Sequence, residues 1–152
     1  MLWRRRIAPA AEPGWVVAEQ DVGPRMNAKP IIDIVDDDAD VLRALSRLLR
    51  AYGWVPRAFN SAAAYLNASR EPLPDCVLLD VQMPEMNGLD LLAQLRVRGF
   101  ETPVIFMTAH EDREAEQAAA RAGATFFLFK PIRRSQLCFA LCTSMRIPVE
   151  GC

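Results

Sequence analysis

Residues 76–88 read CVLLDVQMPEMNG, an apolar run that ends at Asp80 and continues into a polar turn. A short, continuously apolar run is typical of a strand that is buried on both faces of a parallel sheet. A helix is predicted after Gly88, with Leu89 and Leu92 on its inward face. A carboxylate at the end of a buried strand rarely lacks a partner or a role. The stretch therefore predicts a buried parallel strand, a polar turn with Asp80 at its start, and a helix that packs back on the sheet.

The alternation of an apolar run with an amphipathic stretch is repeated five times from residue 31 onward. Such alternation predicts an α/β domain with one parallel sheet and helices on both faces. The predicted strands are Ile31–Val35, Val55–Phe59, Cys76–Leu79, Val104–Met107 and Thr125–Phe129. Right-handed crossovers between five strands of this kind predict the order 2-1-3-4-5 in a doubly wound sheet, with a crevice outside the carboxyl ends of the strands.

Five helices complete the predicted domain. They are expected over residues 41–52, 61–66, 89–95, 112–122 and 135–145. The first helix has leucines on one face and arginines on another, and Gly53 ends it. The fourth helix is rich in alanine and offers little apolar bulk, so we expect it to be the least firmly anchored of the five.

Polar residues stand at the carboxyl ends of four of the predicted strands. They are Asp36, Asp37, Asp38, Asp80, Thr108 and Lys130. All of these ends open on the same crevice of a parallel sheet, which predicts that the six side chains converge. Crowded carboxylates repel one another unless a divalent cation neutralises them, and a ligand set made only of oxygen favours Mg²⁺.

A carboxylate in such a crevice can act in phosphoryl transfer. It can serve as the in-line nucleophile and form an aspartyl-phosphate. Asp80 is the candidate nucleophile, because it ends a buried strand and is followed by MPEMNG. The transferred group needs a cation and a hydroxyl donor, which Lys130 and Thr108 can supply.

Four stretches of the chain resemble the successive signatures of the receiver domains of two-component response regulators. They are IIDIVDDD at 31–38, VLLDVQMPEMNG at 77–88, VIFMTAH at 104–110 and FFLFKPI at 126–132. The resemblance covers residues 31–146, and with the predicted strand order it implies a flavodoxin-like α/β fold. It also implies a switch that is phosphorylated by a sensor histidine kinase or a phosphotransfer protein, and that is not a turnover enzyme.

The resemblance implies a role for each residue of the predicted crevice. Asp80 corresponds to the phosphoacceptor, and Asp36 and Asp37 correspond to the acidic pair that holds Mg²⁺. In receiver domains the metal also takes the main-chain carbonyl two residues after the acceptor, which is that of Gln82 here.

Three further residues correspond to the parts that read the phosphoryl group. Thr108 matches the switch hydroxyl, and Lys130 matches the lysine that pairs with phosphate and precedes a cis proline, here Pro131. Phe127 stands where receiver domains place the aromatic residue that swings inward on activation. The resemblance therefore implies a change in the face made by the fourth helix, fifth strand and fifth helix, to which a downstream protein or a second copy of the chain would bind.

The run Phe126–Phe129 is unusually apolar for an edge strand. It suggests an association surface and a homodimer through this face, although packing of all four side chains under the neighbouring helices remains an alternative. Receiver domains often dimerise in this way.

The ends of the chain are predicted to lie outside the domain. Residues 1–29 contain prolines, glycines and mixed charge without a period, which predicts a flexible arm and leaves Met26 as an alternative start. The receiver domain is expected over residues 30–146 and a short tail over 147–152. The sequence therefore predicts a single-domain regulator of the chemotaxis type, and the alternative is a receiver fragment of a larger DNA-binding regulator or hybrid kinase.

Two other classes of function are less well supported. A phosphohydrolase with an aspartyl nucleophile generally carries a second aspartate two residues further on, where this chain has Gln82. A flavin-binding module would need a phosphate-binding loop after the first strand, where Asp36, Asp37 and Asp38 would repel phosphate.

Composition limits the partners and the compartment. The formal net charge is −1 over 152 residues, which weighs against direct binding of nucleic acid. The four cysteines have no paired metal-ligand spacing, so we expect reduced thiols and a cytoplasmic location. Cys138 and Cys142 are one helical turn apart, which favours two small packing residues, with a metal or redox pair as the alternative. No stretch is long and apolar enough for a membrane span.

Overall fold

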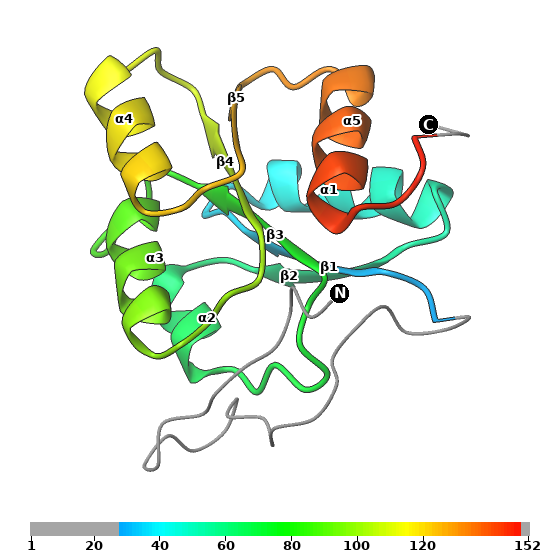
Figure 1. The fold of residues 1–152 in the computed structure, drawn as a ribbon, viewed down its shortest axis with the longest axis horizontal. Coiled ribbons are helices and arrows are strands. Elements are labelled where there is room, and N and C mark those ends of the chain that lie inside the picture. The colour runs from blue at the N-terminus through cyan, green and yellow to red at the C-terminus, as the bar shows by residue number, and fades with distance from the viewer. Residues whose placement is uncertain (1–27, 150–152) are drawn as a thin grey trace.

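A single parallel sheet forms the centre of the molecule in the computed structural model, which describes residues 28–149 (Figure 1). The strands are β1 (Ile31–Val35), β2 (Val55–Phe59), β3 (Cys76–Asp80), β4 (Val104–Thr108) and β5 (Phe126–Phe129). Their order in the sheet is β2-β1-β3-β4-β5. The predicted doubly wound, flavodoxin-like topology is thereby confirmed. Met26, most of the expected arm, and residues 150–152 of the expected tail lie outside the described residues.

Five helices are present, as predicted: four connect consecutive strands, and the fifth follows β5. They are α1 (Ala39–Ala51), α2 (Ala62–Asn67), α3 (Gly88–Val97), α4 (Arg113–Arg121) and α5 (Arg134–Met145). Helices α1 and α5 cover one face of the sheet, and α2, α3 and α4 cover the other (Figure 1). No helix within residues 28–149 is long and apolar enough to cross a membrane.

Two apolar cores lie on the two faces of the sheet. On one face, Ile32 and Ile34 of β1 pack in a cluster with Leu49 and Leu141. On the other face, Val35 and Val77 belong to a cluster that contains residues of α2 and α3, including Tyr65, Leu91 and Leu95. Alternate residues of one strand thus face different helices, as a strand with both faces covered requires.

Two strands extend one residue beyond their predicted ends. β3 includes Asp80, which pairs with Met107, and β4 includes Thr108, which pairs with Phe129. The sheet therefore continues as far as the polar residues, and the two side chains stand on ordered backbone instead of on loops.

A buried polar cluster ties β2 to β1. Asp33 is fully buried, and its carboxylate accepts hydrogen bonds from Arg57 Nε at 2.6 Å and from the Tyr65 hydroxyl at 2.8 Å. Arg57 stands opposite Asp33 in the parallel register. Burial is the main cause that raises the pKa of Asp33, and the Arg57 hydrogen bond opposes it. An aspartate within an apolar run is tolerated because a cation from the next strand satisfies it.

The cysteines agree only in part with the expectation of reduced thiols. Cys76 and Cys142 are buried and are not disulfide-bonded. Cys138 is disulfide-bonded, which contradicts the expectation for that residue. Cys142 is not the disulfide partner of Cys138: the two residues are one helical turn apart on α5, and their sulfurs are 3.8 Å apart, too far for a bond.

Candidate functional site

Three carboxylates meet at the carboxyl ends of β1 and β3. Asp36, Asp37 and Asp80 each offer an oxygen, and these oxygens all lie within 4.8 Å of one another. Asp36 and Asp80 are buried, whereas Asp37 is exposed. Asp38 has a different position, since its side chain accepts from the backbone N–H groups at the start of α1. Of the aspartates expected to converge, the structure therefore groups three and uses the fourth as a helix cap.

Lys130 connects two of these carboxylates. Its Nζ lies 2.8 Å from Asp36 Oδ2 and 3.1 Å from Asp80 Oδ1. The lysine follows β5 directly, and its bond to Pro131 is a cis peptide, as the resemblance implied. The side chain of Lys130 is 22% exposed, so the lysine is only partly buried.

The electrostatic state of Asp80 reflects this crowding. Burial and, to a smaller extent, the negative charge of Asp36 raise the pKa of Asp80 to about 6, although Lys130 opposes both effects. Burial lowers the pKa of Lys130, but its hydrogen bond to Asp36 and the charge of Asp80 outweigh burial, so that the net shift is upward. The site thus holds more negative charge than one lysine neutralises.

The carboxylates suit a hard divalent cation. They present three oxygens of the kind that Mg²⁺ prefers, and one member is accessible to solvent for the waters that Mg²⁺ retains. Burial is the main cause of the upward pKa shift of Asp80, and the neighbouring charge of Asp36 adds to it; a cation would reduce this repulsion. The donor set therefore fits Mg²⁺. Gln82, expected to supply a carbonyl, is exposed in the loop after β3.

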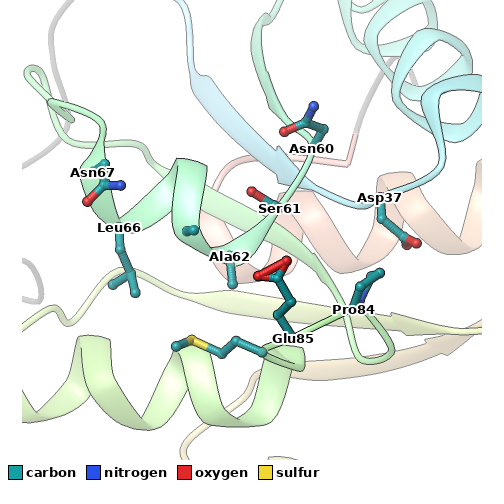
Figure 2. A pocket seen from close by; sticks show the side chains of 10 residues that line it. Asp37, Asn60, Ser61, Ala62, Leu66, Asn67, Pro84 and Glu85 are labelled. Carbon is teal, nitrogen blue, oxygen red and sulfur yellow. The ribbon is translucent and has the colours of Figure 1, made fainter.

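A groove opens beside the acidic group (Figure 2). Asp37 stands at one side, and the groove runs between Ser61 at the start of α2 and Glu85 in the β3–α3 loop. Leu66 and Met86 provide apolar walls. Because Asp37 lines the groove, a molecule in solvent can approach the carboxylates from this direction.

The hydroxyl of Thr108 is engaged with backbone. Thr108 is 2% exposed, and its Oγ1 accepts a hydrogen bond from the backbone N–H of His110 at 3.2 Å. The same hydroxyl lies 3.3 Å from the carbonyl oxygen of His110. The side chain therefore holds the loop that leads into α4. A group that attracted Thr108 toward the carboxylates would compete with these contacts.

Phe127 lies on β5 and packs partly into the core. Its ring centroid is 6.2 Å from that of Phe106 and 5.6 Å from that of Phe129. Phe129 is 39% exposed and Phe139 of α5 is 54% exposed. Phe127 thus connects Phe106 in the core with the more exposed ring of Phe129, whereas Phe139 packs against Phe126 on the other side of β5, with ring centroids 6.1 Å apart.

One residue of the site has a steric role that the sequence did not indicate. A Cβ atom on Gly88 would lie 2.2 Å from the backbone oxygen of Asp80. The Gly88 N–H also donates to the Val81 carbonyl at 2.8 Å. The glycine in MPEMNG therefore lets α3 approach the end of β3, and it helps to fix the backbone that carries Asp80.

Asp80→Asn should make the metal-free protein more stable at neutral pH. The pKa of Asp80 in the folded protein is raised to about 6 from its ordinary value of 3.8, so the folded protein binds the proton more tightly than the unfolded chain. Stability therefore falls as pH rises from about 4 to about 6, and ionised Asp80 then costs on the order of 1–3 kcal/mol. Asp80→Asn removes this dependence. Urea denaturation in EDTA across this pH range measures the pH dependence of stability. An Asp80→Asn variant less stable than wild type at neutral pH would contradict the raised pKa of Asp80.

Comparison with protein families gives an independent assignment. Residues 32–141 match the family model of the response regulator receiver domain. The chain belongs to this family. It is 42% identical over 117 residues to the response regulator protein TmoT of Ectopseudomonas mendocina, and the match covers 77% of this chain and 53% of TmoT. It is 41% identical over 101 residues to the DNA-binding transcriptional regulator NtrC of Escherichia coli, which covers 66% of this chain and 22% of NtrC.

Solved receiver domains share the fold. A response regulator receiver protein from Burkholderia phymatum is 40% identical, with a TM-score of 0.71, and the match covers 79% of this chain and 98% of that structure. The response regulator StyR is 36% identical, with a TM-score of 0.73, over 78% of this chain and 60% of StyR. Receiver domains are signalling switches that interact with histidine kinases or phosphotransfer proteins. The chain spans about half the length of TmoT.

Proposed function

We propose that this receiver domain is a switch in which Asp80 accepts a phosphoryl group from a histidine on a sensor kinase or phosphotransfer protein. The arrangement of a buried Asp80, the neighbouring Asp36 and Asp37, and Lys130 at 3.1 Å supports the proposal. A carboxylate oxygen of Asp80 attacks phosphorus as the bond from phosphorus to the donor nitrogen breaks. The donor imidazole leaves with the electrons of that bond.

The remaining groups have separable roles in this proposal. Asp36, Asp37, Asp80 and the carbonyl of Gln82 would hold Mg²⁺, which supplies positive charge for the phosphoryl oxygens. Lys130 keeps its amine at the acceptor oxygen and pairs with the new phosphate. Thr108 donates its hydroxyl to the phosphoryl group once it has released the His110 backbone.

Incubation with Mg²⁺ and acetyl phosphate is expected to add one phosphoryl group to the protein. Intact-mass measurement detects the adduct, and Asp80→Asn should abolish it because the acceptor oxygen is replaced by an amide nitrogen. Asp90→Asn is the matched control, since Asp90 is an exposed aspartate at the start of α3. An adduct that persists in Asp80→Asn would overturn the proposal.

The output surface is proposed to be the face made by α4, β5 and α5. Inward movement of Thr108 would leave space into which Phe127 could move, and phenylalanine has no hydroxyl to expose, so the change would be one of packing. The exposed rings of Phe129 and Phe139 lie on this face and favour a second copy of the chain or a downstream protein as the partner.

Phosphorylation is expected to promote self-association through this face. Phe127→Ala should weaken it by about tenfold, or about 1.4 kcal/mol, because the variant lacks the ring whose inward movement is proposed to change the face. Sedimentation velocity over a concentration series, with and without acetyl phosphate and Mg²⁺, measures the effect. Val97→Ala is the control, because Val97 is 85% exposed on α3, away from this face. Equal self-association of wild type and Phe127→Ala would count against the mechanism.

A second candidate is a receiver that controls a DNA-binding output domain. It is favoured by relatives such as NtrC, which is named a DNA-binding transcriptional regulator and of which the match covers only 22%. In both candidates the described domain binds protein partners and not nucleic acid directly, and it acts in the cytoplasm. The genomic reading frame beyond Cys152 distinguishes a single-domain regulator from a longer one.

A further inference from the structure

Arg96, in the last turn of α3, is bound by the backbone of two separate segments. Its Nη1 donates to the carbonyl oxygens of Phe100 at 2.7 Å and Thr102 at 3.0 Å. Its Nε donates to the carbonyl of Ala122, and its Nη2 to that of Gly123, each at 3.5 Å. One planar guanidinium group therefore bridges the α3–β4 loop and the C-terminal end of α4.

These contacts are well placed to hold α4. The last carbonyl groups of a helix have no partner within the helix and carry a partial negative charge, so a cation that donates to them is stabilising. Arginine can bond two segments at once because its donors form a rigid fork. Helix α4 has little other anchorage, since Ala119 is the single buried residue among its nine.

The opposite end of α4 is held differently. Its cap is Asp112, whose side chain accepts from the N–H groups of Glu114 and Ala115, which belong to α4 itself. The loop before α4 is exposed, and the backbone N–H of His110 in this loop donates a hydrogen bond to the hydroxyl of the buried Thr108. Inward movement of Thr108 would break contacts in the loop that leads to the start of α4, whereas Arg96 contacts only the other end of the helix.

We propose that Arg96 is a positioning residue that fixes the C-terminal end of α4 as a pivot, so that the signal moves the N-terminal end of the helix. This inference rests on the proposed function, because it assumes that phosphorylation at Asp80 draws Thr108 inward. It adds the direction of the response: α4 tilts about Ala122 and Gly123 and is not displaced as a whole. Residues near the start of α4 would then change most at the output surface.

Hydrogen exchange of the 152-residue chain, first without phosphorylation, tests whether the four hydrogen bonds of Arg96 act as a clamp on the end of α4. The informative amides are those of Ala122, Gly123 and Ala124, which donate to carbonyls within the last turn of α4. Arg96→Gln should increase their exchange by about tenfold, as expected for the loss of hydrogen bonds from a charged donor. Arg98→Gln is the matched control: it removes a charge from the same turn, and within residues 28–149 the Arg98 side chain donates no hydrogen bond to either segment.

Arg96→Lys separates charge from geometry. Lysine keeps the charge, but its single nitrogen cannot bridge both segments. The amides of residues 122–124 should therefore exchange faster in Arg96→Lys than in Arg98→Gln. Equal exchange in Arg96→Gln and Arg98→Gln would overturn the clamp. Faster exchange in the β3 and β4 strands as well would show a general loss of stability and would equally count against it.

The same amides are then followed after treatment with acetyl phosphate and Mg²⁺. In wild type the change should be confined to residues 109–117, and in Arg96→Gln it should extend to residues 118–124. A wild-type change that is as large at the C-terminal end of α4 as at its start would overturn the pivot while leaving the proposed function intact. Absence of a phosphoryl adduct by intact mass would instead overturn the proposed function and the pivot with it. The exchange of Arg96→Gln and Arg98→Gln without phosphorylation would still decide whether Arg96 clamps the end of α4.

Discussion

Lys130→Met is expected to lower the free energy of unfolding by about 2–4 kcal/mol in metal-free buffer at neutral pH. The ammonium group of Lys130 lies against two buried carboxylates, Asp36 at 2.8 Å and Asp80 at 3.1 Å. Its removal leaves both carboxylates without their cation, and breaking a buried ion pair typically costs about 3–5 kcal/mol. The lower range is expected here because the lysine side chain is 22% exposed and solvent screens part of the interaction.

Mg²⁺ should restore much of the stability that Lys130→Met loses. A divalent cation among the carboxylates would replace the missing positive charge. Urea denaturation with EDTA and with Mg²⁺ measures both effects. Lys29→Met is the control, because Lys29 is the other lysine of the chain and is exposed before β1. A Lys130→Met protein as stable as Lys29→Met in EDTA would mean that the two ion pairs contribute nothing.

The opposite signs expected for Lys130→Met and Asp80→Asn provide a joint test of the site. Removal of the cation increases the repulsion between Asp36 and Asp80, whereas removal of one anion decreases it. Burial is the main cause that raises the pKa of Asp80, and the charge of Asp36 adds to it, so removal of the Asp80 charge relieves both effects. A site stabilised only by hydrogen bonds would lose stability in both variants.

The fold followed from the sequence because each strand is a short apolar run between helical stretches. The five runs predicted the strands to within one residue, and the crossover rule predicted their order. The same rule placed the ends of β1 and β3 together, so that the grouping of Asp36, Asp37 and Asp80 was predictable. Asp38 was not separated from this group, because its role as the cap of α1 depends on the direction of one side chain.

Contacts between segments that are distant in the sequence were not predictable. The pairing of Asp33 with Arg57 depends on the register of β1 and β2, which the apolar pattern does not specify when both faces are covered. The bridge from Arg96 to the end of α4 depends on how two helices and a loop pack together. Periodicity reports which face of an element is buried, but not which polar group meets it.

Gly88→Ala is expected to destabilise the protein by about 2–4 kcal/mol and to slow phosphorylation of Asp80. The added methyl group would lie 2.2 Å from the backbone oxygen of Asp80 and 3.1 Å from the Phe106 ring. Neither neighbour is the end of a flexible side chain, so the start of α3 and the end of β3 must separate, with a strain typical of overpacked cores. The separation would also weaken the hydrogen bond from Gly88 to Val81.

A second glycine distinguishes this steric effect from an effect of glycine in general. Gly53 has a φ of 81°, and a methyl group added there would have nothing within 4 Å, so Gly53→Ala should cost only about 1 kcal/mol of backbone strain and leave phosphorylation unchanged. Urea denaturation and the rate of adduct formation with acetyl phosphate compare the two variants. If Gly88→Ala were no more destabilising than Gly53→Ala, α3 would not be in close contact with the acceptor strand. A displaced carboxylate loses the alignment that in-line transfer requires, so it should be phosphorylated more slowly. A Gly88→Ala protein that is destabilised but phosphorylated at the wild-type rate would therefore show that the position of Asp80 does not depend on the contact with α3.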